Sequence, residues 1–181
     1  MTISTDMSRR KLIGMGLAGA GALMLPSTAS AASRGTYALN MTNGNTGERY
    51  QHVIIEDGRW VTEALAEFDW FARDWREDAD YPIDPDSLMT LIRLHKMMES
   101  SQPMVLLSGY RTPKTNRKLR GAATNSLHMR GLALDITQPG RSTNNLRRAA
   151  ISLKAGGVGY YPSQNFVHVD VRGELVRWVK N

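Results

Sequence analysis

The chain has no cysteine among its 181 residues. It therefore cannot form a disulfide bond, and the absence of thiols excludes a cysteine nucleophile and a zinc site built on thiolates. The sequence also has no internal repeat, no low-complexity tract and no apolar run long enough to span a membrane. Its length suits one domain with a filled core better than two domains.

The start of the chain has the features of an export signal. Twin arginines, Arg9 and Arg10, precede a weakly apolar, glycine-rich run and a small-x-small pattern that ends at Ala31. This order is typical of a twin-arginine signal peptide. A membrane anchor is the alternative, but the apolar run is well short of the ~20 residues that cross a bilayer. We expect residues 1–31 to be a cleaved twin-arginine signal peptide and residues 32–181 to form a single domain.

Positive charge is in modest excess. The formal net charge is +6, and removal of three basic residues and one acidic residue with the leader reduces it by two, to +4. A positive domain suits an anionic partner, although a charge of this size can also serve solubility alone. Export makes nucleic acid the least expected of the anionic partners. We therefore expect an anionic cell wall as the partner, and no nucleic acid.

Hydrophobic patterning predicts an α+β fold. Alternating residues bounded by turn residues indicate strands, and apolar residues at helical spacing indicate three main helices. Thr62 is expected to cap the first helix and Asp86 the second. The predicted strands are residues 37–41, 48–56, 104–107, 132–136, 158–160, 166–171 and 174–179, and the predicted helices are 63–76, 88–101 and 144–154, with a short basic helix or turn at 114–120. We expect the helices to pack on one face of a mostly antiparallel sheet.

Two histidines and a carboxylate are candidate metal ligands. His128 and Asp135 are seven residues apart, and Gly131 between them allows the chain to turn back so that both can reach one ion. His168 follows on a predicted strand. Each residue alone is more often structural, but zinc accepts imidazole nitrogen and carboxylate oxygen, and three protein ligands leave a fourth tetrahedral position open for water. The set predicts a site for one Zn²⁺ ion of the kind that hydrolases use.

Two further charged residues are expected near this site. Asp170 follows His168 by two residues, so the alternation of a strand places both side chains on one face. This spacing makes Asp170 a candidate for acid/base catalysis or for orienting a ligand. Arg111 lies in the segment Ser-Gly-Tyr-Arg-Thr at the exit of a predicted buried strand. A fixed cation there can hold a carboxylate or stabilise a developing oxyanion.

The segment around His128 resembles the signature of a known family. Ser126, His128, Gly131, Ala133 and Asp135 match the pattern Ser-x-His-x-x-Gly-x-Ala-x-Asp position for position. This is the signature of the zinc peptidases of the D-alanyl-D-alanine carboxypeptidase and hedgehog-like fold. With the arginine loop, the Phe-Val-His-Val-Asp stretch, the Gly-Gly-Val-Gly-Tyr-Tyr-Pro segment and the twin-arginine leader, the chain is most similar to the murein endopeptidase K group.

The resemblance implies roles for the candidate residues. His128, Asp135 and His168 would be the zinc ligands, and Arg111 would polarise the scissile carbonyl. Ser126 would orient a ligand or bind the peptide.

The chain departs from the family pattern at one position. Many relatives have a glutamate or aspartate three residues before the last ligand as the general base, and this position is Asn165, which cannot take a proton from water. Asp170 is our candidate for the acid/base residue, with Asp84 and Asp80 as weaker candidates.

We expect an exported zinc metallopeptidase that hydrolyses the peptide cross-links of bacterial peptidoglycan, acting as a monomer in the periplasm. Its expected partners are peptidoglycan stem peptides and the twin-arginine translocation machinery. Two alternatives stay open: a carboxypeptidase that removes a terminal D-residue from stem peptides, and a zinc-stabilised module that binds the wall without cutting it. Asn165 favours the binding module, whereas the ligand set and Arg111 favour an enzyme.

Overall fold

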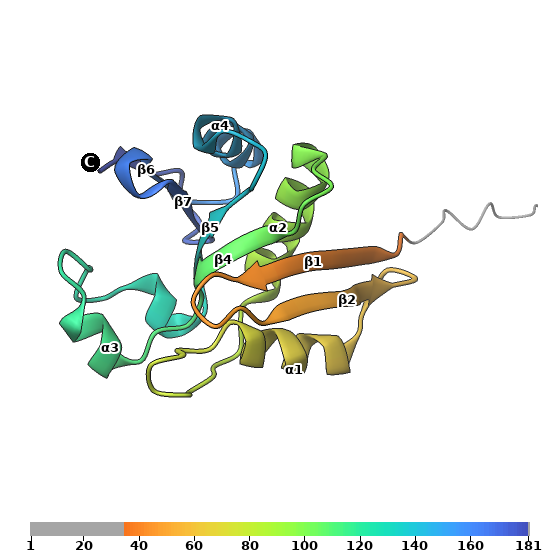
Figure 1. Cartoon of the computed structure of the whole chain (residues 1–181), viewed down its shortest axis with the longest axis horizontal. Helices are drawn as coiled ribbons and strands as arrows, with labels where there is room; N and C mark the ends of the chain where they lie inside the picture. The colour runs from red at the N-terminus through yellow and green to blue at the C-terminus, as the bar shows by residue number, and fades with distance from the viewer. Residues whose placement is uncertain (1–34, 181) are drawn as a thin grey trace, which may run out of the picture. The chain divides into compact units, whose positions relative to one another are not determined.

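An eight-stranded sheet carries the fold in the computed structural model, which describes residues 35–180 (Figure 1). The predicted leader, residues 1–31, lies outside the described residues. Across the sheet the strands are ordered β3-β2-β1-β4-β5-β7-β6-β8. The strands are β1 Tyr37–Asn43, β2 Arg49–Glu56, β3 Arg59–Trp60, β4 Met104–Ser108, β5 Ala133–Thr137, β6 Val158–Tyr161, β7 Phe166–Asp170 and β8 Arg177–Val179. The helices are α1 Thr62–Phe71, α2 Pro85–Met98, α3 Pro113–Lys118 and α4 Thr143–Leu153, with 3₁₀ turns η1 Leu127–Arg130 and η2 Pro162–Gln164.

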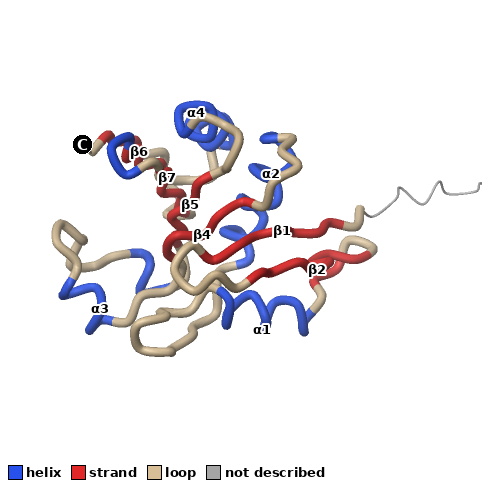
Figure 2. The backbone as a smooth tube through the Cα atoms, in the orientation of Figure 1, coloured by secondary structure: helices blue, strands red, loops and turns tan. Residues whose placement is uncertain are grey.

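The sheet is mostly antiparallel, which confirms the predicted α+β class. Only the β1–β4 and β6–β8 pairs are parallel among the described strands. The tube view shows the strands as a band through the molecule, with α1 beside β2 (Figure 2). The last predicted strand departs from the antiparallel pattern, because β8 runs parallel to β6. Among residues 35–180, none of the helices is long and apolar enough to cross a bilayer.

Strand alternation separates a core face of the sheet from a polar face. Leu134 in β5 and Val169 in β7 are paired and belong to the hydrophobic core, which α1, α2 and α4 also enter. Asp135 and His168, the next pair, therefore point to the opposite face. The largest fully buried side chains of the core are Tyr50, Phe68, Leu39, Met41, Ile54, Leu88, Leu91, Leu94, Met104, Leu106, Leu134 and Ile136. The core thus fixes the backbone from which the polar residues project.

Helix α1 ends five residues before the predicted boundary, at Phe71 instead of Arg76. The reason is tertiary, because other segments bond the carbonyl groups at its end. The side-chain amide of Asn43 donates to the Phe71 carbonyl at 2.9 Å, and the backbone N–H of Tyr110 donates to the Ala72 carbonyl at 2.8 Å. The chain leaves the helix to make these contacts with β1 and with the loop after β4.

Both predicted helix caps are wrong. Thr62 is the first residue of α1, and Val61 occupies the N-cap position without a side-chain bond. In α2 the capping residue is Asp84, whose Oδ1 accepts from the backbone N–H of Asp86 at 2.9 Å, and Pro85 is the first helical residue. A proline suits that position because its missing N–H would have no partner inside the helix.

The aromatic residues of α1 and the loop after it divide between core and surface. Phe68 and Phe71 are buried in the core. Trp70 and Trp75 are 48% and 38% exposed. Arg73 lies over the Trp70 ring, and Arg76 lies over the Trp75 ring at 4.3 Å from its centroid. The loop after α1 therefore presents a tryptophan and an arginine to solvent.

Asp74 ties this loop to the segment that carries the predicted arginine. Its Oδ2 accepts from the backbone N–H of Thr112 at 2.9 Å and from the Thr112 hydroxyl at 2.8 Å, and its Oδ1 accepts from the backbone N–H of Arg76 at 3.2 Å. Burial opposes ionisation, but the hydrogen bonds outweigh it and hold the pKa of the Asp74 carboxyl below its ordinary value. The ionised carboxylate therefore stabilises the fold.

Asp74→Asn should lower the free energy of unfolding at pH 7 by about 1–3 kcal/mol, because an amide cannot accept these three bonds equally well. The native pKa is depressed, so the contribution is complete above the unfolded value of 3.8 and declines as the pH falls through the native pKa. Urea unfolding at pH 7 and at pH 3 measures it, with the exposed turn variant Asp57→Asn as control. A parent-to-variant difference that widens in acid would contradict this assignment.

Candidate metal centre

Three polar side chains converge on the polar face of the sheet. Pairing of β5 with β7 sets Asp135 directly opposite His168. His128 comes from η1, and Gly131 follows this turn in the left-handed conformation, with φ 67°. A side chain at Gly131 would also meet the Pro82 carbonyl, because a Cβ there would lie 2.2 Å from that oxygen. The predicted reversal at Gly131 is confirmed, and it brings His128 back over the strand that bears Asp135.

The distances between these groups fit one small cation. His128 Nε2 lies 3.2 Å from His168 Nδ1 and 3.3 Å from Asp135 Oδ1, and His168 Nδ1 lies 2.8 Å from Asp135 Oδ1. Donors bound tetrahedrally to zinc at 2.0–2.1 Å lie about 3.3 Å apart. All three residues are buried, with exposures of 2%, 6% and 9% for His128, Asp135 and His168. These residues could hold a metal ion.

The remaining hydrogen bonds of the two histidines indicate which nitrogen atoms would face the ion. His128 Nδ1 lies 2.8 Å from the Gly109 carbonyl, and His168 Nε2 lies 3.0 Å from Asp170 Oδ2. Both partners are acceptors, so each of these nitrogen atoms carries the proton in the neutral ring. The other nitrogen of each ring then directs a lone pair toward Asp135 Oδ1. With both rings neutral, three acceptors would face one point, an arrangement that could hold a cation.

The charges around the ligands fall into a consistent pattern. Burial disfavours the charged form of His128 and lowers the pKa of its imidazole. Burial also opposes ionisation of Asp135, but the two histidines hold the pKa of its carboxyl well below the ordinary value. For His168, burial lowers the pKa, while the hydrogen bonds to Asp135 and Asp170 outweigh burial and raise it. The centre therefore presents an ionised carboxylate and at least one neutral imidazole.

Arg111 contacts the ligand Asp135 itself. Its Nη2 donates to Asp135 Oδ2, and its Nε donates to the Ser108 hydroxyl at 2.7 Å. The backbone N–H of Arg111 also donates to the His128 carbonyl at 3.2 Å. The arginine is thus built into the centre, as predicted, but two of the three nitrogen atoms of its guanidinium already have protein partners.

Asp170 lies on the same strand face as His168, which confirms the predicted alternation. Both of its oxygen atoms are engaged, because Oδ1 accepts from the backbone N–H of Gly157 at 2.9 Å and Oδ2 accepts from His168 and from Arg172. Burial opposes ionisation, but these bonds lower the pKa of the Asp170 carboxyl. A side chain with 0% exposure and a depressed pKa suits the orientation of His168 better than the predicted acid/base role.

Arg172 and Trp178 belong to the centre but were not predicted from the sequence. Arg172 contacts both oxygen atoms of Asp170 and lies over the Trp178 ring. The Trp178 ring lies 5.2 Å from the His168 ring and packs on Gly159, where a Cβ would come within 2.5 Å of it. The two-residue spacing of positions 168, 170 and 172 could have indicated that Arg172 lies near Asp170 and His168. Trp178 comes from β8. The sequence pattern predicted this strand but not the strand with which it pairs.

The other candidate residues do not belong to the set that could bind the ion. Asn165 Oδ1 accepts from the Thr143 hydroxyl at the start of α4, and Asp84 caps α2. Asp80 is exposed in the loop before α2. Ser126 is buried and precedes η1, without a side-chain capping bond. Of these four, Ser126 precedes the turn that carries His128, and the backbone N–H of Asp84 donates to the Gly131 carbonyl at 3.0 Å.

The two remaining histidines, His52 and His95, lie outside the centre. His52 pairs with Glu67 at 2.9 Å on the surface of β2 and α1. His95 lies in α2, where burial lowers the pKa of its imidazole. Neither belongs to the set of residues that could bind the ion.

Comparison with known proteins extends over nearly the whole chain. Residues 31–178 match the family described as peptidoglycan L,D-endopeptidase MepK. A peptidoglycan L,D-endopeptidase MepK of Escherichia coli (strain K12) is 39% identical over 179 residues, which cover 96% of this chain and 98% of the relative. A probable peptidoglycan L,D-endopeptidase MepK of Haemophilus influenzae is 31% identical over 96% of each chain. The range matched by the family, residues 31–178, spans the whole centre.

Proposed function

Because the chain belongs to the family of the peptidoglycan L,D-endopeptidase MepK, we propose that it is a zinc peptidase that hydrolyses peptide cross-links in bacterial peptidoglycan. The observation that carries the proposal is the ligand set, in which two imidazole lone pairs and one carboxylate oxygen face a common point. His128, Asp135 and His168 would hold one Zn²⁺ ion. The names of the relatives support the substrate, and the geometry supports hydrolysis.

The chemistry of such a centre requires few protein groups. Bound zinc would polarise the scissile carbonyl and lower the pKa of a water molecule towards ~7. Asp135 contributes the negative charge of the ligand set, and the protonated nitrogen atoms of His128 and His168 are held by the Gly109 carbonyl and by Asp170. Those contacts keep both rings oriented toward the ion during turnover.

Arg111 is proposed to have two roles, one toward the ligand Asp135 and one toward the substrate. Its bond to Asp135 Oδ2 leaves Oδ1 directed at the histidines, so the arginine orients a ligand. Nη1 of Arg111 has no protein partner within residues 35–180 and would donate to the substrate carbonyl as negative charge develops there. Ser126, buried beside η1, is proposed to contact the bound peptide.

Asp170 is proposed to orient His168. The carboxylate receives the His168 Nε2 proton and is itself fixed by Arg172 and by the Gly157 N–H. In this arrangement Asp170 stays ionised and fixes the tautomer that exposes Nδ1. A Cβ at Gly157 would lie 2.4 Å from Asp170 Oδ2, so only glycine allows the strands to approach this closely.

Digestion of purified muropeptide dimers by the zinc-loaded protein tests the proposal. We expect monomers to appear, and to stop appearing when a chelator removes the metal. Release of a single amino acid would instead identify a carboxypeptidase. Binding of the dimers without any product would identify a wall-binding module, and either result would contradict the proposed endopeptidase.

We also propose that the protein reaches the periplasm through the twin-arginine translocation machinery and works there as a monomer. Replacing Arg9 and Arg10 together with lysine should leave the precursor in the cytoplasm, because the machinery reads that pair as an address. Cell fractionation with N-terminal sequencing measures this, and exported parent protein should begin at Ala32. The surface variant Arg93→Lys should be exported normally. Exported protein that still begins at Met1 would show that the leader is retained.

A further inference from the structure

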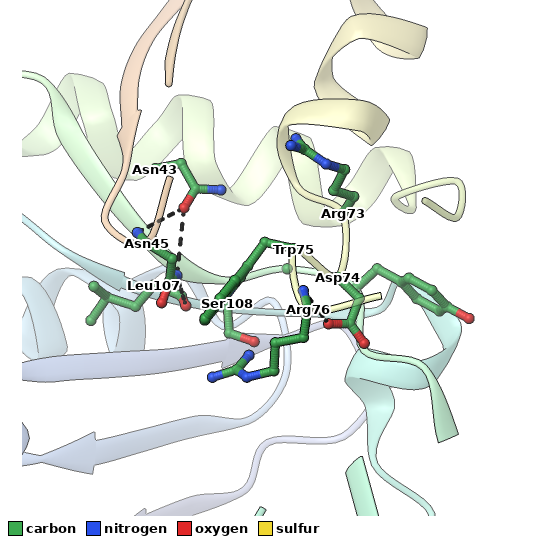
Figure 3. Close-up of a pocket in the computed structure, with 10 residues that line it drawn as sticks. Asn43, Asn45, Arg73, Asp74, Trp75, Arg76, Leu107 and Ser108 are labelled. Atoms are coloured by element: carbon green, nitrogen blue, oxygen red, sulfur yellow. Dashed lines mark hydrogen bonds between the residues drawn. The ribbon is translucent and has the colours of Figure 1, made fainter. Parts of the chain in front are cut away.

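The loop after α1 places an arginine without a carboxylate partner next to the candidate metal centre. Arg76 is exposed and lies over the Trp75 ring, and it forms no ion pair with any residue of the described chain. A small hollow lined by Arg76 and Trp75 also has Ser108 and Gly109 in its wall. In the close-up, the side chains of Trp75 and Arg76 both lie beside Ser108 (Figure 3). The hollow therefore adjoins residues that support the ligands.

Contacts connect this hollow to the ligand set in two steps. Ser108 is the register partner of Asp135 across β4 and β5, and its hydroxyl accepts from Arg111 Nε. Arg111 in turn donates to Asp135. The Gly109 carbonyl accepts from His128 Nδ1. A group bound at Arg76 would thus lie at the same end of β4 as a peptide bound at the metal.

The backbone of the Arg76 loop is held firmly against the arginine loop. Asp74 accepts from the N–H of Arg76 and from Thr112, and the Tyr110 N–H donates to the Ala72 carbonyl. The two loops touch at Gly109, where a Cβ would lie 2.3 Å from the Ala72 carbonyl oxygen. These contacts fix the position from which the Arg76 side chain projects relative to Arg111. A cation placed in this way loses less entropy when it binds a ligand.

Three other arginines in or beside the centre are already paired with carboxylates. The pairs are Arg73 with Glu48 and Asp78, Arg111 with Asp135, and Arg172 with Asp170. Capture of a substrate carboxylate by Arg111 would compete with its bond to the ligand Asp135. Arg76 has no ion-pair partner among the described residues, and its planar guanidinium can bind a carboxylate through two parallel hydrogen bonds.

We propose that Arg76, supported by Trp75, binds a free carboxylate of the substrate peptide and so selects acidic stem peptides. This inference rests on the proposed function, because it names the substrate group that the same site recognises. Arg76 is a specificity-determining residue and takes no part in the bond cleavage. The Trp75 ring holds the guanidinium over one face and covers the apolar part of the peptide next to the carboxylate.

Binding to zinc-free protein tests this inference separately from catalysis. The probes are two synthetic stem peptides that differ only in a terminal carboxylate, free in one and amidated in the other, and calorimetry gives the dissociation constants. We expect the parent to bind the free acid about tenfold more tightly, as for a hydrogen-bonded charge. Arg76→Gln should abolish this preference, and Arg76→Lys should keep only part of it. Arg93→Gln, which removes an exposed arginine on α2, should keep all of it.

Equal affinity of the parent for the two peptides would overturn the inference, and so would an unchanged preference in Arg76→Gln. The preference for the free acid should also shrink at high salt, because exposed charges are screened.

If the proposed function is wrong, the result is different: the zinc-loaded parent will not cut muropeptide dimers, whatever the binding measurements show. If the parent cuts dimers, Arg76→Gln should raise KM about tenfold with kcat nearly unchanged, as expected for a residue that binds without acting on the reacting bond.

Discussion

His168→Ala should leave the protein without stoichiometric zinc and reduce cleavage of muropeptide dimers to the level of the chelated parent. The imidazole supplies one of only three protein ligands, and two ligands hold zinc weakly. Even residues that merely orient a ligand cost 10–100-fold when they are lost, so a direct ligand should cost more than about 100-fold. His128→Ala and Asp135→Asn should have the same effect. Elemental analysis of the purified variants, alongside their rates, measures both quantities.

A matched control separates this effect from a general loss of histidine. His52→Ala removes an exposed imidazole of β2 that pairs with Glu67 of α1 and is not among the residues that could bind the ion. It should keep zinc and activity. Circular dichroism should show that each ligand variant stays folded, since the hydrophobic core does not include these side chains. Normal turnover with full zinc in any ligand variant would remove that residue from the proposed set.

Asp170→Asn should weaken zinc binding about 10–100-fold, as is usual when the partner of a ligating histidine is lost. An amide at this position can still contact His168, but it no longer favours the ring with its proton on Nε2. Most of the lost rate should return when zinc is supplied in excess. Competition with a chromogenic chelator measures the affinity, and rates at saturating zinc measure the recovery.

The result also distinguishes the orienting role of Asp170 from the acid/base role that the sequence suggested. A general base would lose roughly 10²–10⁴ in rate while zinc affinity stayed normal. Arg172→Gln provides an independent test, because it touches the same carboxylate from the other side. It should shift zinc affinity in the same direction as Asp170→Asn. Normal zinc affinity in both variants, with a large loss of rate in Asp170→Asn, would restore Asp170 as the acid/base candidate.

Part of the geometry of the candidate metal site could be predicted from the sequence, because that part depends on local rules. Strand alternation places His168 and Asp170 on one face, and Gly131 adopts the left-handed conformation that turns His128 back toward Asp135. The pairing of β5 with β7 then follows from two apolar strands that need a common core. Residues whose placement depends on one strand or one turn could therefore be predicted from the sequence.

Features that depend on distant contacts could not be predicted in this way. The end of α1 is set by Asn43 and Tyr110, which lie far away in the sequence, so helical spacing alone extended the helix too far. The engagement of Arg111 with Asp135 likewise depends on a bulge between β4 and β5. Trp178 reaches His168 only because β8 pairs in parallel with β6. Each of these cases requires knowledge of which segments meet.

The central claim is that one zinc ion held by His128, Asp135 and His168 makes this chain a cross-link endopeptidase. Stepwise addition of zinc to the metal-free protein, with bound metal and cleavage of muropeptide dimers followed on the same samples, tests it most directly. The proposal predicts that cleavage rises in proportion to bound zinc and reaches its plateau at one equivalent. Full cleavage of the dimers before any zinc is added, or no cleavage after one equivalent has bound, would contradict it.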